Sequence, residues 1–233
     1  GQSRGFHCRP RNEVMQHFLK DNRGIITGRQ GLAVGEEYPW NLIFIGENIT
    51  DCNIFYRGGG LLIPFYIYQQ HQKIGILANN EKYYNIAPTE VKYFNTLWGK
   101  KFQPEHLFYY IYAILHSNIY REKYAEYLRI DFPRIPFTEN YNLFSKLAKL
   151  GKELADLHLL KSTFLDHPLV KYQGTGPDDT VEKITYNPEN GVVRINKYKY
   201  FEGISDEVWN YHIGGCLLYT YPSPRDRTST RMP

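Results

Sequence analysis

Helical spacing of apolar residues near the start of the chain gives way to short strand-like runs. From Arg11 to Leu19 the apolar positions follow a helical period, and polar turn residues at 21–24 end it. Runs rich in β-branched and aromatic residues follow, separated by glycine-rich turns, at 25–27, 41–45 and 61–68. We therefore expect a strand-rich part over residues 1–100.

A helical block is predicted next, over residues 101–165. Pro104 suits the first turn of a helix, and apolar residues then recur every three or four positions up to residue 117. A second helix is expected at 120–128. The segment 131–136 contains two prolines, so it should be extended and act as a brace or linker.

The longest helix is predicted at 139–161 from a stripe of five leucines. They lie alternately four and three residues apart, at positions 143, 147, 150, 154 and 157. Such a stripe favours burial against a neighbouring helix of the same chain, and we expect helix 104–117 to be that partner. A dimeric coiled coil stays open as an alternative, although the stripe spans little more than two heptads.

The remaining part, residues 166–215, contains a predicted β-hairpin. Two alternating runs, 181–186 and 192–196, flank a turn that ends in Asn190-Gly191, a dipeptide typical of tight hairpins. Strands and helices thus occupy separate stretches of the sequence. This separation indicates an α+β fold with a strand-rich part, a bundle-like helical middle and a C-terminal hairpin region.

The distribution of charge and the high tyrosine content are compatible with a nucleic-acid partner. The chain has 28 basic and 24 acidic residues, a net charge of +4, but residues 1–29 hold six Lys or Arg against two acidic residues. Such a local excess suits phosphates, and the 21 tyrosines offer faces that stack on bases. An ordinary solvated surface and core packing of the tyrosines explain these features as well.

Several kinds of site are excluded by spacing. The three cysteines form no disulfide or zinc framework, and the eight histidines show no ligand spacing. Nuclease-like, methyltransferase-like and glycine-rich strings each lack the rest of their motif, so we expect no catalytic residue, metal or cofactor here. No apolar run is long enough to cross a membrane, and the missing signal peptide indicates an internal piece of a longer cytoplasmic chain.

Interaction chemistry remains, and its candidate carriers are basic and amide side chains. Those that could contact DNA are Arg9, Arg11, Arg29, Gln30, Lys100, Lys101, Lys197 and Lys199. Arg29 and Gln30 follow a predicted strand and should project from a loop at a sheet edge, where arginine can bond guanine and glutamine adenine. The alternative is that Arg29 forms an ion pair with Glu36 or Glu37.

The two lysines near the C-terminus are expected to serve a different purpose. Lys197 and Lys199 alternate with tyrosines along an expected strand, which would place both lysines on one face, where they suit phosphates. The alternative is that both are merely solvated.

Particular strings resemble a known family. They include FYYIYAILHS at 108–117, YREKYA at 120–125, DFPRIP at 131–136 and WNYHIGG at 209–215, with shorter matches at 4–17 and 48–51. In this order they resemble the C-terminal specificity region of Type ISP restriction–modification enzymes. The resemblance covers the chain to about residue 215.

The resemblance implies a function and a context. In that family one polypeptide joins a nuclease, an ATP-driven motor, an adenine-N6 methyltransferase that uses S-adenosylmethionine, and a target-recognition region. The present chain would be that last region, with residues 1–100 as its strand-rich recognition part. S-adenosylmethionine, ATP and magnesium would then belong to upstream parts, and the partners would be double-stranded DNA and the upstream methyltransferase.

The final residues depart from the family pattern. Residues 216–233 look like translated sequencing-adapter sequence, so we expect them to carry no fold.

Three functional hypotheses stay open, and the first two are the main ones. The first is sequence-specific binding of duplex DNA. The second is a structural brace or protein-interaction module of the same enzyme without direct base readout, favoured by the low net charge and the leucine stripe. Free-standing catalysis is the third.

Overall fold

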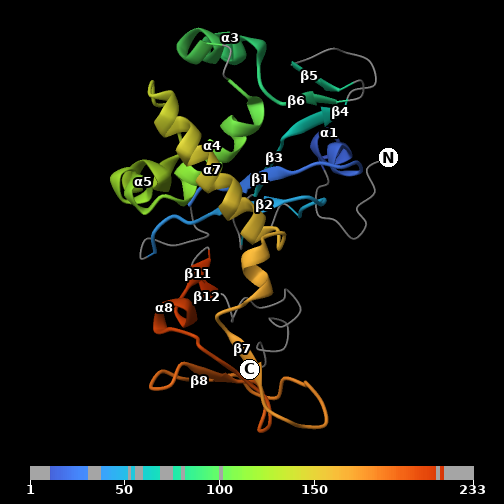
Figure 1. Cartoon of the computed structure of the whole chain (residues 1–233), viewed down its shortest axis with the longest axis vertical. Helices are drawn as coiled ribbons and strands as arrows, with labels where there is room; N and C mark the ends of the chain where they lie inside the picture. The colour runs from blue at the N-terminus through green and yellow to red at the C-terminus, as the bar shows by residue number, and fades with distance from the viewer. Residues whose placement is uncertain are drawn as a thin grey trace, which may run out of the picture. The chain divides into compact units, whose positions relative to one another are not determined.

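The computed structural model describes residues 11–30, 38–51, 54–55, 60–68, 76–79, 82–99, 102–213 and 216–217. It divides into two compact units, Gly1–Ser162 and Thr163–Pro233. Helices and several small antiparallel sheets occur together, so the expected α+β class is confirmed (Figure 1). Within the described ranges, no helix is both long and apolar enough to cross a bilayer.

The described residues of the first unit form two three-stranded antiparallel sheets. One sheet has the order β2 (Ile43–Gly46), β1 (Gly24–Thr27) and β3 (Leu61–Pro64), with β1 in the centre. All three strands overlap runs that the sequence predicts as strands. The other sheet has the order β4 (Tyr66–Tyr68), β6 (Lys82–Tyr84) and β5 (Ile76–Asn79). Before β1, the predicted helix 11–19 forms α1 (Asn12–Met15) and the 3-10 turn η1 (Gln16–Phe18).

Among the described residues of the first unit, five helices follow the sheets. They are α3 (Pro88–Trp98), α4 (Pro104–His116), α5 (Asn118–Lys123), α6 (Ala125–Ile130) and α7 (Tyr141–His158). The sequence analysis missed α3, although Pro88 in its first turn and the buried Phe94 and Trp98 give a helical pattern. The segment 131–136 has no helix, as its prolines predict.

Two tyrosine hydroxyl groups anchor this extended segment to the helices. Tyr110 on α4 donates a hydrogen bond to the carbonyl oxygen of Pro136 at 2.7 Å, and Tyr120 on α5 donates to that of Arg134 at 2.8 Å. Buried tyrosine hydroxyls need such partners. The segment is therefore held as a brace across the helices.

Helix α7 packs on α4 as expected, but not through its leucine stripe (Figure 1). The buried side of α7 consists of Phe144, Ala148, Gly151 and Ala155. A Cβ on Gly151 would lie 1.9 Å from the carbonyl oxygen of Tyr109, so the two backbones touch there. Because only small residues permit this approach, the leucines lie beside the contact.

The expected burial of the leucine stripe is wrong for Leu143 and Leu150, which are 47% and 57% exposed. Leu147, Leu154 and Leu157 are half-buried, and the first two pack on the edges of the core.

The second unit is a four-stranded antiparallel sheet with short elements after it. The strand order is β7 (Lys171–Gln173), β10 (Tyr200–Glu202), β9 (Val192–Arg194) and β8 (Thr185–Asn187). The 3-10 turn η3 (Thr163–Asp166) precedes the sheet, and α8 (Asp206–Trp209), β11 (His212–Ile213) and β12 (Cys216–Leu217) follow it. Strands β8 and β9 form the predicted hairpin, with Gly191 in its turn at φ +61°.

The expectation that residues 216–233 carry no fold is wrong for the first two of them. Cys216–Leu217 form β12, which pairs with β11 in an antiparallel register. The later residues lie outside the described part of the chain.

The core of the first unit joins strands to helices. One cluster combines Ile25 and Leu62 from the sheet with Phe108 and Tyr112 from α4. A second, aromatic cluster joins α3 to α7 through Phe94, Trp98 and Phe144, whose rings stack in series, and Tyr110 adds α4 to it. Residues 1–100 and 101–165 thus share one core. The expected division into a target-recognition part and a helical brace stays a prediction.

Candidate nucleic-acid interface

Arg29 lies where the sequence analysis expects it, exposed just beyond the end of β1. The preceding Gly28 is fixed, because Trp40 donates its indole N–H to the Gly28 carbonyl oxygen at 2.9 Å. The guanidinium carbon of Arg29 lies 5.3 Å from the ring centroid of Phe132, a cation–π distance. Its alternative partners Glu36 and Glu37 lie outside the described residues. Arg29 is thus held over an aromatic ring with its planar donors at the surface.

Gln30 does not project from a loop edge, and that expectation is wrong. Its side chain is 3% exposed, and its amide nitrogen donates to the carbonyl oxygen of Tyr38 at 3.0 Å. A buried amide is held in place by such bonds, since leaving it unpaired would cost free energy. Gln30 therefore supports the loop that carries Arg29.

Arg11 lies on the other side of the β1 sheet from α4. Side chains alternate along a strand, so Ile25 and Thr27 face α4 while Ile26 faces α1. Arg11 is exposed beside Ile26, and its carbonyl oxygen accepts the first hydrogen bonds of α1. The remaining candidates of this unit, Arg9, Lys100 and Lys101, lie outside the described residues.

Lys197 and Lys199 occupy the turn between β9 and β10, so the expected strand is wrong. Asn196 makes this turn, because its buried carboxamide oxygen accepts hydrogen bonds from the backbone N–H groups of Tyr198 and Lys199 at 2.8 and 2.7 Å. Lys197 is exposed, with its ammonium group 4.7 Å from the Tyr198 ring centroid.

Lys199 has a structural partner that Lys197 lacks among the contacts described for it. Its ammonium nitrogen lies 3.4 Å from a carboxylate oxygen of Asp179, and its side chain is only 16% exposed. Asp179 also accepts a hydrogen bond from the Tyr172 hydroxyl at 2.5 Å. That bond and the Lys199 charge lower the pKa of Asp179, which therefore remains a carboxylate.

A cluster of tyrosines and cations at the opposite end of β1 was missed by the sequence analysis. Tyr66 pairs across the β4–β6 sheet with Tyr84, and Tyr68 pairs with Lys82, so these four side chains share one face. The Lys82 ammonium group lies 3.8 Å from the Tyr66 ring centroid. We call these four residues, together with Arg23, the Tyr66 cluster.

Hydrogen bonds connect the Tyr66 cluster to α4. Arg23 donates to the Tyr109 hydroxyl, and Tyr84 donates its own hydroxyl proton to the Glu105 carboxylate. Burial, and then the bond to Glu105, raise the pKa of Tyr84 well above its usual value. The Tyr84 hydroxyl therefore stays protonated.

Asn22 fixes the position of the Tyr66 cluster. It is 3% exposed, and its carboxamide oxygen accepts from the backbone N–H groups of Arg23 and Tyr66 at 2.9 and 3.0 Å. Its amide nitrogen donates to the carbonyl oxygens of His17 and Tyr66 at 2.9 and 2.8 Å. All four hydrogen-bonding positions of the amide are used, so the start of β4 is tied to the start of β1.

The available chemistry suits a nucleic acid. Half-buried tyrosine rings can stack on bases, and lysines beside them can approach phosphates. The sequence signal was the alternation Tyr66, Tyr68 facing Lys82, Tyr84, which becomes visible only once the register of the sheet is known.

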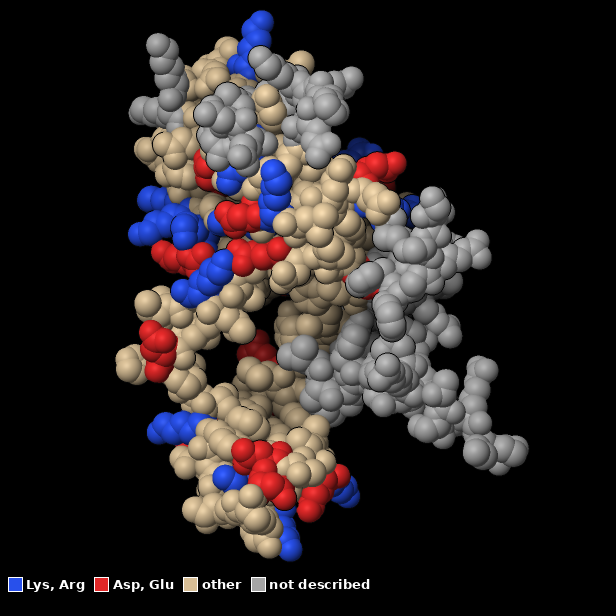
Figure 2. Space-filling model, turned by 90° about the vertical axis from the view of Figure 1, so that its right-hand side faces the viewer, with Lys and Arg blue, Asp and Glu red and all other residues tan. Residues whose placement is uncertain are grey.

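Charges of both signs are mixed on the molecular surface. On the face in Figure 2, Lys and Arg side chains stand among Asp and Glu side chains and form no continuous basic patch. Along α7, Lys149 and Lys152 pair with Glu153 and Asp156 at 4.0 and 2.5 Å. Specific points on the surface therefore matter more for binding than the total charge.

Several solved structures resemble this chain. The DNA-bound Type ISP restriction-modification enzyme LlaBIII aligns with a TM-score of 0.64 and 24% identity, over 89% of this chain and 13% of its own. The DrdV–DNA complex gives 0.62 and 24%, over 88% and 20%. A nuclease-deletion mutant of the Type ISP enzyme LlaGI, in complex with a DNA substrate mimic, gives 0.56 and 22%, over 85% and 16%. This chain thus spans a fifth or less of each of these chains.

A family model also matches. Residues 2–218 fit the Type ISP C-terminal specificity domain, which includes the residues of β12. No curated protein matches the chain.

Proposed function

Because the chain belongs to the family of Type ISP C-terminal specificity domains, we propose that it reads a double-stranded DNA sequence within a larger restriction–modification enzyme. The family match over residues 2–218 carries this proposal. The three similar structures support it, since all are complexes with DNA or with a DNA substrate mimic.

Two places on the first unit are proposed to contact the duplex. Arg29 presents planar donors suited to a guanine edge, and the Tyr66 cluster offers stacking faces beside a lysine. They stand at opposite ends of β1. Arg23 of the cluster and Arg29 are six residues apart, which is about 20 Å along an extended chain. In the second unit, Lys197 is proposed to contact phosphate.

The parent enzyme is proposed to supply the chemistry. Upstream parts would carry an adenine-N6 methyltransferase with S-adenosylmethionine, together with a nuclease and a motor that use ATP and magnesium. The short span of this chain on LlaBIII, 13% of that protein, leaves ample room for such parts. The chain itself would position the enzyme on its target and contact the methyltransferase.

Selection from a random duplex pool tests the proposal. The chain is mixed with the pool at low salt, and the retained duplexes are sequenced after several rounds. We expect one enriched motif, with affinity that falls steeply as salt rises because bound phosphates release counterions. Retention without an enriched motif would contradict base readout.

A brace without base readout is the second candidate function, and one observation favours it. Ile119 on α5 and Tyr127 and Ile130 on α6 are each more than 70% exposed. Large exposed apolar side chains suit a protein partner. Absence of any DNA affinity at low salt, combined with binding to the separately produced upstream part, would favour the brace.

A further inference from the structure

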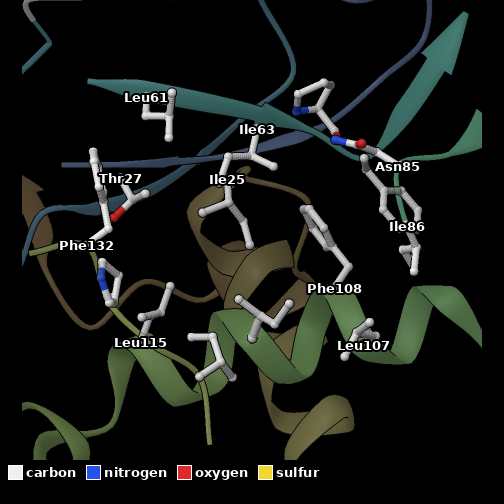
Figure 3. A pocket seen from close by; sticks show the side chains of 15 residues that line it. Ile25, Thr27, Leu61, Ile63, Asn85, Ile86, Leu107, Phe108, Leu115 and Phe132 are labelled. Atoms are coloured by element: carbon white, nitrogen blue, oxygen red, sulfur yellow. The ribbon is translucent and has the colours of Figure 1, made fainter. Parts of the chain in front are cut away.

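Phe132 in the brace, residues 131–136, contacts the arginine that is proposed to read the duplex. Its ring centroid lies 5.3 Å from the guanidinium carbon of Arg29, although the two residues are far apart in the sequence. Phe132 and Thr27, the last residue of β1, line the same apolar pocket, and Figure 3 shows them at one end of it. The brace therefore reaches the end of β1, just beyond which Arg29 lies.

The backbone of Phe132 is held from both sides. Its N–H group donates to a carboxylate oxygen of Asp131 at 2.8 Å, and the following Pro133 restricts Phe132 to extended conformations. Two residues later, the carbonyl oxygen of Arg134 accepts the hydroxyl proton of Tyr120 at 2.8 Å. The Phe132 side chain is 37% exposed, so part of its ring faces solvent. The brace thus offers a fixed aromatic ring at the surface.

An aromatic ring can hold an arginine without using its hydrogen-bond donors. The ring face attracts the positive charge, whereas a carboxylate partner would bond to the N–H groups at the edge of the guanidinium. The contact with Phe132 therefore leaves the N–H groups of Arg29 to the O6 and N7 acceptors of a guanine. Because an arginine side chain is flexible, restraining it before binding also lowers the entropy that recognition costs.

We propose that Phe132 is a positioning residue for base readout, whose ring holds the Arg29 guanidinium in the orientation that bonds one guanine. The neighbours Gly28 and Gln30 are hydrogen-bonded, so the backbone there is already fixed, and the Phe132 ring restrains the side chain. The brace then contributes to specificity and is more than a linker. This role rests on the proposed function, and Phe132 acts through Arg29 without a need to touch the DNA.

Selection from the random duplex pool tests the role, with the 233-residue chain and its variants run in parallel. Arg29→Ala should relax the enriched motif at one G·C pair, which identifies the pair that Arg29 reads. Phe132→Leu should lower the preference at that same pair about two- to fivefold, the range of one exposed cation–π contact. The other motif positions and the salt dependence should stay unchanged, because the Arg29 charge is kept. Phe132→Tyr keeps the ring and should restore the preference.

A matched control and a second ring-free variant accompany Phe132→Leu. Phe137 follows the brace, is 43% exposed, and its ring contacts those of Phe94 and Tyr110. Phe137→Leu should therefore leave the base preference unchanged. Phe132→Met also removes the ring and should behave as Phe132→Leu does. Thermal melting verifies that each variant folds.

The outcomes separate this role from the proposed function. A wild-type chain that enriches no motif overturns both. If the wild-type chain does enrich a motif, the role alone is overturned when Arg29→Ala relaxes no position, or when both ring-free variants keep the full preference at the Arg29 pair. Equal relaxation of every position in those variants, or relaxation of the same pair in Phe137→Leu, would also overturn it.

Discussion

Two histidines near the α4–α7 contact are kept neutral by their surroundings. The Tyr112 hydroxyl oxygen and the Nδ1 atom of His158 are hydrogen-bonded at 2.6 Å, and the ring centroids of His158 and His116 lie 5.1 Å apart. Burial, and then the charges of Arg121 and His158, lower the pKa of His116 to about 3. Since the Arg121 guanidinium only donates, the His116 Nδ1 atom 3.3 Å away accepts its bond.

This environment makes stability depend on pH. The unfolded chain binds a proton at His116 below its usual pKa of 6.5, whereas the folded chain binds it only near 3. Stability is therefore complete above pH 6.5 and falls as pH decreases, by up to about 1.4 kcal/mol per pH unit from this group. Urea unfolding at pH 7.5, 6 and 5 should show this slope, and His116→Gln should reduce it. Equal slopes in both proteins would refute the prediction.

Lys197 and Lys199 should differ on substitution, because only one is tied to the fold. We expect Lys197→Ala to weaken binding to all duplexes alike and to reduce the slope of log affinity against log salt by about 1, with stability unchanged. Lys199→Ala should also lower the melting temperature, since it removes one of the two partners described for Asp179. Filter binding at several salt concentrations, paired with thermal melting, measures both effects. Unchanged DNA affinity in Lys197→Ala would remove this residue from the interface.

The contact between α4 and α7 depends on a small residue. We expect Gly151→Ala to destabilise the chain by about 2 kcal/mol or more, because its methyl group would overlap the Tyr109 carbonyl and push the helices apart. Alanine's better helix propensity, worth about 1 kcal/mol, is too small to offset this. Denaturant unfolding measures the difference. Leu150→Ala, at an exposed position one residue earlier, is the matched control and should change stability by about 0.5 kcal/mol or less.

The two units should differ in local stability. In the described part of the second unit, the buried hydrophobic residues are Val193 and Ile195, whereas the first unit has a continuous core of strands and helices. Amide protons of β8, β9 and β10 should therefore exchange at least about tenfold faster than those in the middle of α4 and α7. Hydrogen exchange followed by mass spectrometry tests this. Equal protection in both units would show that the second unit draws on stabilisation that its small core does not provide.

Local patterns decided much of the fold from the sequence alone. Helix α4, the prolines of the brace and the β8–β9 hairpin depend on spacing and turn residues within a few positions, so they were predicted. The family strings were likewise readable in the chain, and the match over residues 2–218 confirms them. Arg29 was predicted at the surface because it follows a predicted strand and stands just before a glycine, in an expected loop.

Tertiary structure decided which faces are used. Helix α7 buries its small residues, since backbone contact at Gly151 excludes leucine, and a leucine stripe alone does not reveal how closely a partner approaches. The Gln30 side chain is held inside the structure by a hydrogen bond to the carbonyl oxygen of Tyr38, eight residues away. The Tyr66 cluster exists because strand register and the bonds of Asn22 bring distant residues together. Contacts between remote residues depend on the packed geometry of the whole unit, and no local spacing encodes them.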